Sequence, residues 1–338
     1  MDSAFTSYSV TDRSYVSFVK RAIHLEVLHK RFTSQQKGEI DIIVSEITSN
    51  LVKHAGGGEL LYRISNEGEE DSVFEILAVD KGPGMADTTR MLKDGISTKN
   101  TLGQGLGAIH RLSNLAQVYS IPGWGTVLYA KVHTRKERYE KSRDLELEVR
   151  SLCINKPREL VCGDGFRIKR TETGAFIFFG DGLGHGEHAK FAVDSAGDFF
   201  MKTELEDPVE ILRGIHESIR RTRGLVGVVA HCDLKNKQWR ICGAGNILVR
   251  LYQGITYRSY MSYNGTVGLN IPNSIKVSEY PLEKNQYIIM CSDGIRTRWD
   301  ITKYASIQRL DPLLLAASIY KDFTRGNDDS SVLIAKVV

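Results

Sequence analysis

The sequence predicts an α+β protein with two domains, because three of its features agree. The chain has 338 residues, whereas a single domain usually holds about 100 to 200. The charge-rich stretch of residues 133–148 separates two parts that each contain enough apolar residues for a core. In both parts, apolar runs typical of strands alternate with helical patterns, which favours mixed sandwiches over a doubly wound sheet.

Residues 1–132 form the first predicted domain. A helix is expected over residues 38–54, because the apolar residues there recur at helical spacing. A second helix should follow the glycines within residues 103–107. Strands are expected at three apolar runs, which are residues 59–65, 73–79 and 126–132.

Residues 149–338 form the second predicted domain, which is richer in strands. Its predicted helices cover residues 186–202, 207–222 and 311–325. Its predicted strands cover residues 174–180, 225–233, 238–242, 246–252, 286–291 and 330–337. The linker of residues 133–148 fits either a rigid helix or a hinge.

Composition and charge exclude several classes of protein. The net charge of +4 is spread along the chain, so we expect no binding surface for nucleic acid or membrane. The five cysteines show no C-x-x-C spacing and lie mostly in apolar runs, which is typical of reduced core residues. The first residues lack a signal pattern, and no stretch approaches the roughly 20 apolar residues of a membrane span. We therefore expect a cytoplasmic protein.

The first candidate site combines a helix with a strand end. Glu46 and Asn50 are four residues apart, so they project from one face of the predicted helix. A carboxylate and an amide in this arrangement can hold a hydrated magnesium ion. Glu46 alone is also a candidate base that deprotonates an attacking hydroxyl. The strand of residues 73–79 leads into Asp80, whose carboxylate can accept a hydrogen bond from an adenine amino group.

Glycines follow Asp80 and recur before the second predicted helix. Gly82 and Gly84 permit a tight turn and a close approach of the backbone to a ligand. The run GQGLG, which contains Gly103, Gly105 and Gly107, presents backbone N–H groups to phosphate at the start of a helix. Its spacing differs from the G-x-G-x-x-G of dinucleotide folds, so a Rossmann domain is not expected.

The ordered set EITSN, DKGPG, GQGLG and GWGT resembles the GHKL (Bergerat-fold) ATPase superfamily, and within it the RsbT-type serine kinases of bacterial partner switching. This resemblance implies an α/β sandwich that binds ATP and Mg²⁺. It also implies that Glu46 is the base, Asn50 a magnesium ligand and Asp80 the adenine contact. The remaining nucleotide-binding residues that it implies are Gly82, Gly84, Gly103, Gly105, Gly107 and Thr126. A histidine kinase is disfavoured, because no helix pair with a phospho-acceptor histidine precedes these motifs.

Four aspartates of the second domain form another candidate site. Asp164, Asp181, Asp293 and Asp328 each stand beside glycine or another acid next to a predicted strand. Carboxylates gathered at one end of a sandwich need cations to neutralise them, so bound divalent metal is expected. Two such ions would activate a bridging water for attack on a phosphoryl group, and no nucleophilic side chain is then required.

The motifs DGLGHG, GAGNILVR, YNGTVG, CSDGIRTRW and NDDSSVLI resemble the SpoIIE and RsbX branch of the PPM phosphatases. The resemblance implies an α-β-β-α sandwich with two Mn²⁺ or Mg²⁺ ions. The implied ligands are Asp164, Asp181, Asp293, Asp328 and the backbone carbonyl of Gly182. His185 either contacts phosphate or a water or caps the next helix, and Asp329 is either a supporting acid or a surface acid.

Together these resemblances imply a regulator that phosphorylates and dephosphorylates serine or threonine on a STAS-domain antagonist or scaffold protein. The alternative is a phosphatase whose first domain senses nucleotide or docks a protein, as anti-sigma factors do. A sigma-factor regulatory module is a further candidate partner. The sequence leaves open the oligomeric state, including a homodimer, and the identity of the upstream signal.

Overall fold

The computed structural model describes residues 4–67, 71–88, 105–134 and 147–338. Its internal contacts divide the chain into two compact units. The first unit comprises Met1–Glu140 and Ser306–Lys321, and the second comprises Lys141–Ala305 and Asp322–Val338. In the described ranges, no helix is long and apolar enough to cross a membrane.

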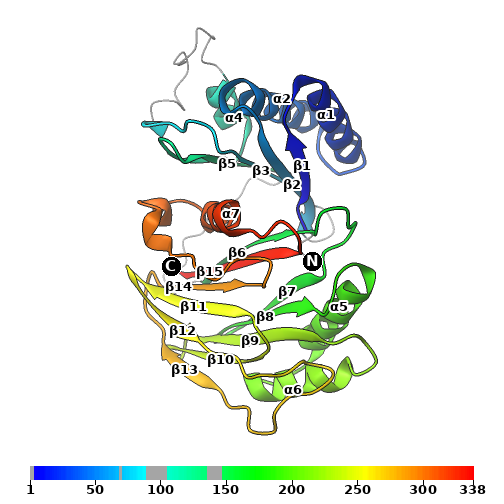
Figure 1. Ribbon diagram of the computed structural model, residues 1–338, viewed down its shortest axis with the longest axis vertical. Coiled ribbons are helices and arrows are strands. Elements are labelled where there is room, and N and C mark those ends of the chain that lie inside the picture. Colours follow the sequence, from blue (N-terminus) through cyan, green and yellow to red (C-terminus); the bar gives the residue numbers. More distant parts are fainter. Residues whose placement is uncertain (1–3, 68–70, 89–104, 135–146) are drawn as a thin grey trace. The chain divides into compact units, whose positions relative to one another are not determined.

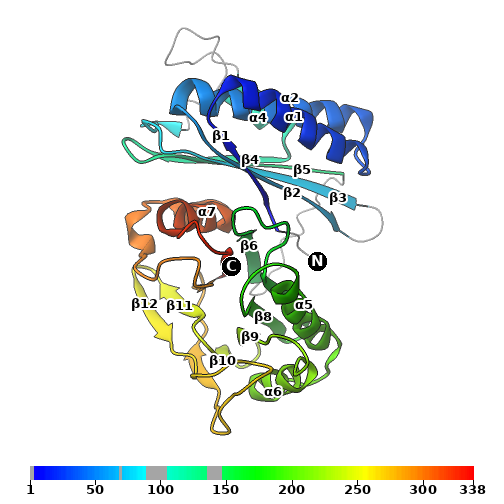
Figure 2. The same ribbon diagram turned by 45° about the vertical axis from the view of Figure 1, so that its right-hand side comes forward.

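The first unit is built on an antiparallel sheet with the strand order β1-β2-β3-β5-β4. These strands are β1 (Thr6–Val10), β2 (Gly58–Glu67), β3 (Asp71–Val79), β4 (Leu115–Ile121) and β5 (Gly125–His133). One face is covered by α1 (Arg13–Leu28), α2 (Ser34–Asn50) and α4 (Gly105–Leu112), as Figure 2 shows. A π-helical turn, Leu51–Ala55, continues α2.

Local sequence explains where α2 starts and which face it buries. The Thr33 hydroxyl accepts a hydrogen bond from the backbone of Gln36, and the Gln36 side chain accepts one from the backbone of Thr33, which is a capping box. Ile40, Ile43 and Ile47 then lie on one side of the helix and join the buried core against the sheet.

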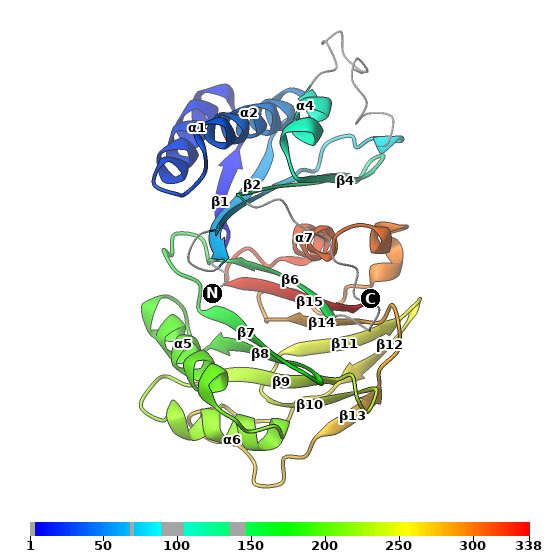
Figure 3. The same ribbon diagram turned by 180° about the vertical axis from the view of Figure 1, so that it is seen from behind.

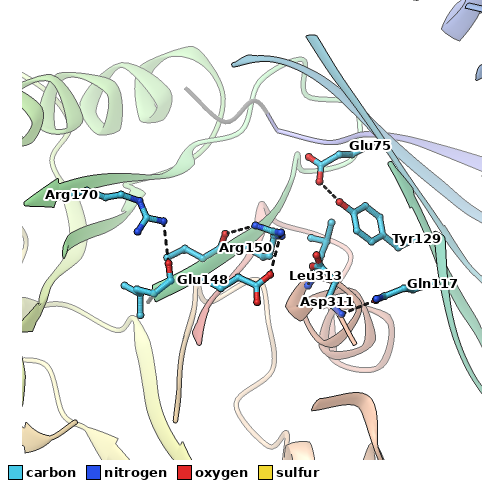
Figure 4. A network of polar contacts seen from close by, with 10 residues as sticks. Glu75, Gln117, Tyr129, Glu148, Arg150, Arg170, Asp311 and Leu313 are labelled. Atoms are coloured by element: carbon cyan, nitrogen blue, oxygen red, sulfur yellow. Dashed lines mark hydrogen bonds and ion pairs between the residues drawn. The ribbon is translucent and has the colours of Figure 1, made fainter. Parts of the chain in front are cut away.

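The other face of this sheet is also buried. Phe74 and Ile76 of β3 belong to the core under the helices, so Glu75 between them points to the opposite face. There the Glu75 carboxylate accepts a hydrogen bond from the Tyr129 hydroxyl at 2.6 Å (Figure 4). It accepts another from Arg63 Nε, also at 2.6 Å. Helix α7 (Pro312–Phe323) lies on this face of the sheet through its residues up to Lys321, which belong to the first unit.

The second unit contains two antiparallel sheets that form stacked layers (Figures 1 and 3). One has the order β13-β10-β9-β8-β7 and the other β12-β11-β14-β15-β6. The strands are β6 (Leu147–Ile154), β7 (Asp164–Thr171), β8 (Gly174–Gly182), β9 (Leu225–Asp233), β10 (Gln238–Ala244), β11 (Leu248–Gln253), β12 (Thr256–Tyr260), β13 (Ser278–Pro281), β14 (Tyr287–Cys291) and β15 (Ser330–Val337).

Two helices cover the first of these sheets. They are α5 (Glu187–Lys202) and α6 (Pro208–Ser218), and their apolar residues share a core with strands β8, β9 and β10. The Asp207 side chain caps α6 by accepting hydrogen bonds from two backbone N–H groups of its first turn. The result is a mixed α/β fold, in which the metal-ligand candidates stand at strand ends.

The predicted helices and apolar strands are all confirmed, with ends that shift by a few residues. The sequence did not anticipate that residues 306–321 would group with the N-terminal strands. Most of the predicted linker, residues 135–146, lies outside the described residues.

Candidate functional site

Backbone hydrogen bonds hold the side chain of Asp80 at the end of β3. Its Oδ1 accepts from Gly82 N at 2.8 Å and from Thr126 N at 3.1 Å. Burial raises the pKa of this carboxyl above its ordinary value, while the two hydrogen bonds and the charge of Lys321 oppose that rise. Among the described residues, no hydrogen bond reaches Oδ2, so this oxygen is available to a ligand donor.

Close backbone packing around Asp80 requires glycine. Gly84 has a φ of 71°, and a Cβ added there would lie 2.1 Å from the Ile121 carbonyl oxygen. Gly125 has a φ of 111°, and its added Cβ would lie 2.2 Å from the Asp80 carbonyl oxygen. Any other residue at either position would force these chain segments apart. The loop that starts at Asp80 and the turn between β4 and β5 are therefore packed backbone against backbone.

Glu46 and Asn50 meet the glycine-rich motif. A Cβ added to Gly105 would lie 2.7 Å from Glu46 Oε2 and 3.7 Å from Asn50 Oδ1. Both side chains thus point at the first described residue of α4, as their spacing on α2 predicts. Gly107 is buried within α4, and Gly103 lies outside the described residues.

The predicted nucleotide residues therefore form two clusters in the first unit. One contains Asp80, Gly82, Gly84 and Thr126, and the other contains Glu46, Asn50 and Gly105. The first cluster offers a carboxylate oxygen to a donor, and the second offers oxygen ligands next to a helix end that favours anions. Two clusters with these properties suit a nucleotide, because its base donates hydrogen bonds and its phosphates are anionic.

The second unit brings its four predicted aspartates into electrostatic contact. Asp164 and Asp181 face each other on the neighbouring strands β7 and β8. Burial raises the pKa of Asp164 to about 7, while the nearby hydroxyl groups of Ser292 and Ser331 oppose that rise. Both carboxylate oxygens are buried, and neither makes a well-formed hydrogen bond within the described part of the chain. Burial also raises the pKa of Asp181, and the negative charges of Asp164, Asp293 and Asp328 raise it further.

The loops that carry Asp293 and Asp328 lie against each other. A Cβ added to Gly294 would lie only 1.8 Å from the Asp329 carbonyl oxygen. The Asp293 carboxylate accepts a hydrogen bond from Asn246 Nδ2 at 3.2 Å, which gives that asparagine a role in holding the loop. The close approach of the two loops explains why glycine follows Asp293.

Asp329 is a buried anchor rather than a surface acid. Its Oδ1 accepts a hydrogen bond from Lys156 N at 2.7 Å, and its Oδ2 accepts one from Gly163 N at 2.9 Å. Gly163 immediately precedes Asp164 in the chain. Asp329 therefore holds the segment before Asp164 beside Asp328. The sequence signal for this role was the doubled acid itself.

Gly182 and His185 belong to the loop between β8 and α5. A Cβ on Gly182 would lie 2.4 Å from the Ala189 carbonyl oxygen, so only glycine fits there. His185 Nδ1 lies 2.7 Å from Glu159 Oε1. The N-cap of α5 is Gly186, and no described side chain makes a capping hydrogen bond to that helix. His185 is therefore held by Glu159, and the capping interpretation is wrong.

The carboxylates fit a divalent cation in chemistry, although their side chains do not form a complete ligand set. Within the described ranges, no three His, Cys, Asp or Glu side chains converge closely enough to hold a metal ion. The buried oxygens of Asp164 nevertheless make no well-formed hydrogen bond to the described residues, and the carboxyls repel one another. A cation between the carboxylates would bind the buried Asp164 oxygens and would also neutralise the repulsion.

Comparisons with known proteins agree with this chemistry. The family model of stage II sporulation protein E (SpoIIE) matches residues 171–338. The phosphoserine phosphatase RsbX of Bacillus subtilis (strain 168) is 23% identical over 143 residues, which are 42% of this chain and 71% of RsbX. The serine/threonine-protein kinase RsbT of the same organism is 31% identical over 100 residues, which are 29% of this chain and 74% of RsbT.

Two solved structures show the same fold. A crystal structure of RsbX in complex with magnesium matches with a TM-score of 0.52 and 19% identity, over 58% of this chain and 99% of that one. A structure from work on the bacterial stressosome matches with a TM-score of 0.53 and 27% identity, over 56% of this chain and 99% of that one. The buried aspartates and these similarities lead to one conclusion: the chain carries a SpoIIE-type PPM protein serine/threonine phosphatase domain and is homologous to both RsbX and RsbT.

Proposed function

We propose that this chain phosphorylates a serine or threonine on a STAS-domain partner and also removes that phosphate. Removal is supported by the homology to the SpoIIE family and to RsbX. Addition is supported by the similarity to RsbT, the serine/threonine-protein kinase. The observation that carries the kinase part is that Glu46 and Asn50 both point at Gly105 in the glycine-rich motif.

In the phosphatase reaction, this chain's residues hold cations and orient the substrate phosphate. The proposed ligands of two Mn²⁺ or Mg²⁺ ions are Asp164, Asp181, Asp293, Asp328 and the Gly182 carbonyl oxygen. When bound, the ions supply a water of lowered pKa and neutralise phosphoryl oxygens. Asp329 contributes by tying the chain before Asp164 to the chain at Asp328.

In the kinase reaction, a GHKL-type domain would bind ATP with Mg²⁺. Asp80 Oδ2 accepts the hydrogen bond of the adenine amino group, because Oδ1 is already occupied by two backbone donors. Glu46 takes the proton of the partner's hydroxyl, and Asn50 is the magnesium ligand. The remaining nucleotide-lining residues in the proposal are Gly82, Gly84, Gly103, Gly105, Gly107 and Thr126.

The alternative is a phosphatase with a nucleotide-sensing or protein-docking first domain. A pure docking module needs neither Glu46 nor Asn50, and a nucleotide sensor has no use for a base at Glu46. Glu46 is therefore the residue that separates the two functions. A cytosolic location fits both, because all five cysteines are buried thiols.

The test measures ATP hydrolysis, because phosphorylation and dephosphorylation of the same residue together consume ATP. Wild-type protein should hydrolyse ATP continuously only when an unphosphorylated STAS-domain protein of the same genome is present. With the Asp181→Asn variant, ATP hydrolysis should stop after about one phosphate has been transferred per partner molecule, because the phosphate is no longer removed. Glu46→Gln should consume no ATP but should still dephosphorylate partner that carries phosphate.

The outcomes distinguish the functions. ATP consumption that does not depend on any STAS partner contradicts the two-reaction cycle. Removal of phosphate by Glu46→Gln, together with ATP binding and no consumption by wild type, favours the sensing or docking module. Failure of wild type to hydrolyse phosphorylated partner with Mn²⁺ contradicts the phosphatase assignment.

A further inference from the structure

Three arginines of the second unit lie on chain segments that adjoin the acid-bearing loops of the candidate metal centre. They are Arg223, Arg296 and Arg325, and all three are exposed. Within the part of the chain that the structure describes, no carboxylate pairs with any of their guanidinium groups. The three positive charges are therefore available to an anion that comes from outside the chain.

Arg223 lies over the loop that follows Asp181. The carbonyl oxygen of the next residue, Gly224, accepts a hydrogen bond from Leu183 N at 3.1 Å. A Cβ added to Gly184 would lie 3.0 Å from an Nη atom of Arg223. The backbone beside Arg223 and its side chain thus both contact this loop, which places the guanidinium group at one side of the candidate metal centre.

Arg296 and Arg325 belong to a short pairing between the loops of the other two acids. An antiparallel bridge joins Ile295 to Thr324. Next to this bridge, Arg325 N donates to the Gly294 carbonyl oxygen at 2.8 Å. Successive residues of paired segments point to opposite faces, so Arg296 and Arg325 are diagonal neighbours on the face opposite to Ile295. Diagonal neighbours with long side chains can contact the same ligand.

The neighbouring acids do not use these arginines. Arg296 follows Asp293 by three residues, and Arg325 precedes Asp328 by three residues. The Asp293 carboxylate nevertheless accepts its hydrogen bond from Asn246, and the Asp328 carboxylate accepts one from the backbone N–H of the following residue. The carboxylates thus remain available to cations, and the arginines remain available to a different group.

The exposure of the arginines indicates what that group is. Asp164 is only 7% exposed, and cations among the acids would neutralise the phosphoryl oxygens there. The arginines lie at the surface around this centre, where the chain on either side of a phosphorylated residue has to pass. Guanidinium groups bind carboxylates through parallel N–H donors. Acidic side chains next to the phosphorylated residue therefore suit these positions.

We propose that Arg223, Arg296 and Arg325 select a phosphorylated serine or threonine that is flanked by acidic residues of the partner protein. The inference rests on the proposed function, because it names a substrate class for the phosphatase site. Each exposed ion pair changes affinity by roughly 1.5-fold to 5-fold. Three such pairs together give a preference on the order of 10-fold.

The test compares two phosphopeptides that differ only in the residues next to the phosphoserine, which are glutamates in one peptide and glutamines in the other. Phosphate release with Mn²⁺ gives kcat/KM for each peptide. Wild type should favour the acidic peptide about 10-fold, and high salt should reduce this preference, because it screens exposed charges. Each of Arg223→Gln, Arg296→Gln and Arg325→Gln should lower the preference roughly 1.5-fold to 5-fold.

The triple variant should bring the ratio of the two kcat/KM values close to one. Should the triple variant fail to fold, the three single variants decide the question. A second readout does not depend on catalysis: fluorescence anisotropy of the labelled acidic phosphopeptide on Asp181→Asn protein should show weaker binding when the arginine substitutions are added.

Lys235→Gln is the matched control. Lys235 is an exposed cation in the turn after β9. Asp233, near that turn, pairs with Gly174, which lies at the opposite end of β8 from Asp181. The substitution removes one positive charge, as each arginine substitution does, but far from the candidate metal centre. It should therefore leave the preference for the acidic peptide unchanged.

The outcomes separate the inference from the proposed function. Equal hydrolysis of both peptides by wild type, or hydrolysis of p-nitrophenyl phosphate but of neither peptide, overturns the inference and leaves the phosphatase assignment intact. A preference that the triple variant retains removes the arginines from it. An equal loss on p-nitrophenyl phosphate and on both peptides assigns the arginines to the phosphate itself and overturns their role in selecting acidic residues. Failure of wild type to hydrolyse any of the three substrates overturns the phosphatase part of the proposed function, and the inference with it.

Discussion

Asp164 should make the metal-free phosphatase unit less stable as the pH rises. Its pKa is about 7 in the folded protein, against an ordinary value of 3.8. The folded state therefore holds its proton at pH values where the unfolded chain has lost it. Stability from this group is complete below about pH 4 and is lost as the pH rises through 7. Because each pH unit between the two values costs about 1.4 kcal/mol, the full loss is about 4 kcal/mol.

The substitution Asp164→Asn removes this penalty. In EDTA at pH 8 we expect the variant to be more stable than wild type by about 2 kcal/mol, since relaxation around the carboxylate reduces the full figure. At pH 4 the two proteins should be equally stable. With Mn²⁺ at pH 8 the order should reverse, because the cation neutralises the carboxylates of wild type. The control Asp194→Asn should instead destabilise, since Arg167 and Lys190 hold the pKa of Asp194 below its ordinary value.

The assay follows tryptophan fluorescence during unfolding in urea. The chain has three tryptophans, and in a Trp124→Phe background the remaining two, Trp239 and Trp299, are both buried in the second unit. The signal then reports on that unit, even if the two units unfold separately. Equal stability of Asp164→Asn and wild type in EDTA at pH 8 would refute the claim that the buried Asp164 carboxylate destabilises the protein when no cation is bound.

Three further substitutions test the two sites. Asp181→Asn should abolish Mn²⁺-dependent hydrolysis of p-nitrophenyl phosphate, measured by absorbance, while ATP affinity is unchanged; undiminished turnover would contradict the metal assignment. Asp80→Asn should weaken ATP binding at least 10-fold in calorimetry without slowing nucleotide-free hydrolysis, and normal affinity would remove Asp80 from the adenine site. Gly105→Ala should also weaken ATP binding, because its Cβ would lie 2.7 Å from Glu46 Oε2, whereas Gly38→Ala, which meets open space, should have no effect.

The strands that the sequence revealed are those in the interior of the three sheets. Each of β3, β8 and β14 has neighbours on both sides and reads as an apolar run. The strands that it did not reveal are the sheet edges, for example β1 with TSYSV and β12 with TYRSY. Edge strands carry polar residues on their exposed side, so their sequences look like loops.

The candidate sites were predictable wherever a motif is local. The spacing of Glu46 and Asn50, the Asp-Gly pair at Asp181 and the acid pair at Asp328 are visible in the sequence itself. The contact of Lys321 with Trp124 joins residues 197 positions apart, and no local sequence pattern near either residue predicts it. The pairing of His185 with Glu159 and the anchoring by Asp329 likewise depend on tertiary structure.

The most direct test of the central claim is transfer of phosphate from radiolabelled ATP to STAS-domain proteins of the same genome. Asp181→Asn protein is used with Mg²⁺, so that the label is not removed. We predict that one partner becomes labelled on serine or threonine, and that wild-type protein with Mn²⁺ then releases the label. The absence of label from every partner, despite measurable ATP binding, would contradict the kinase and leave a phosphatase with a nucleotide-sensing or docking domain.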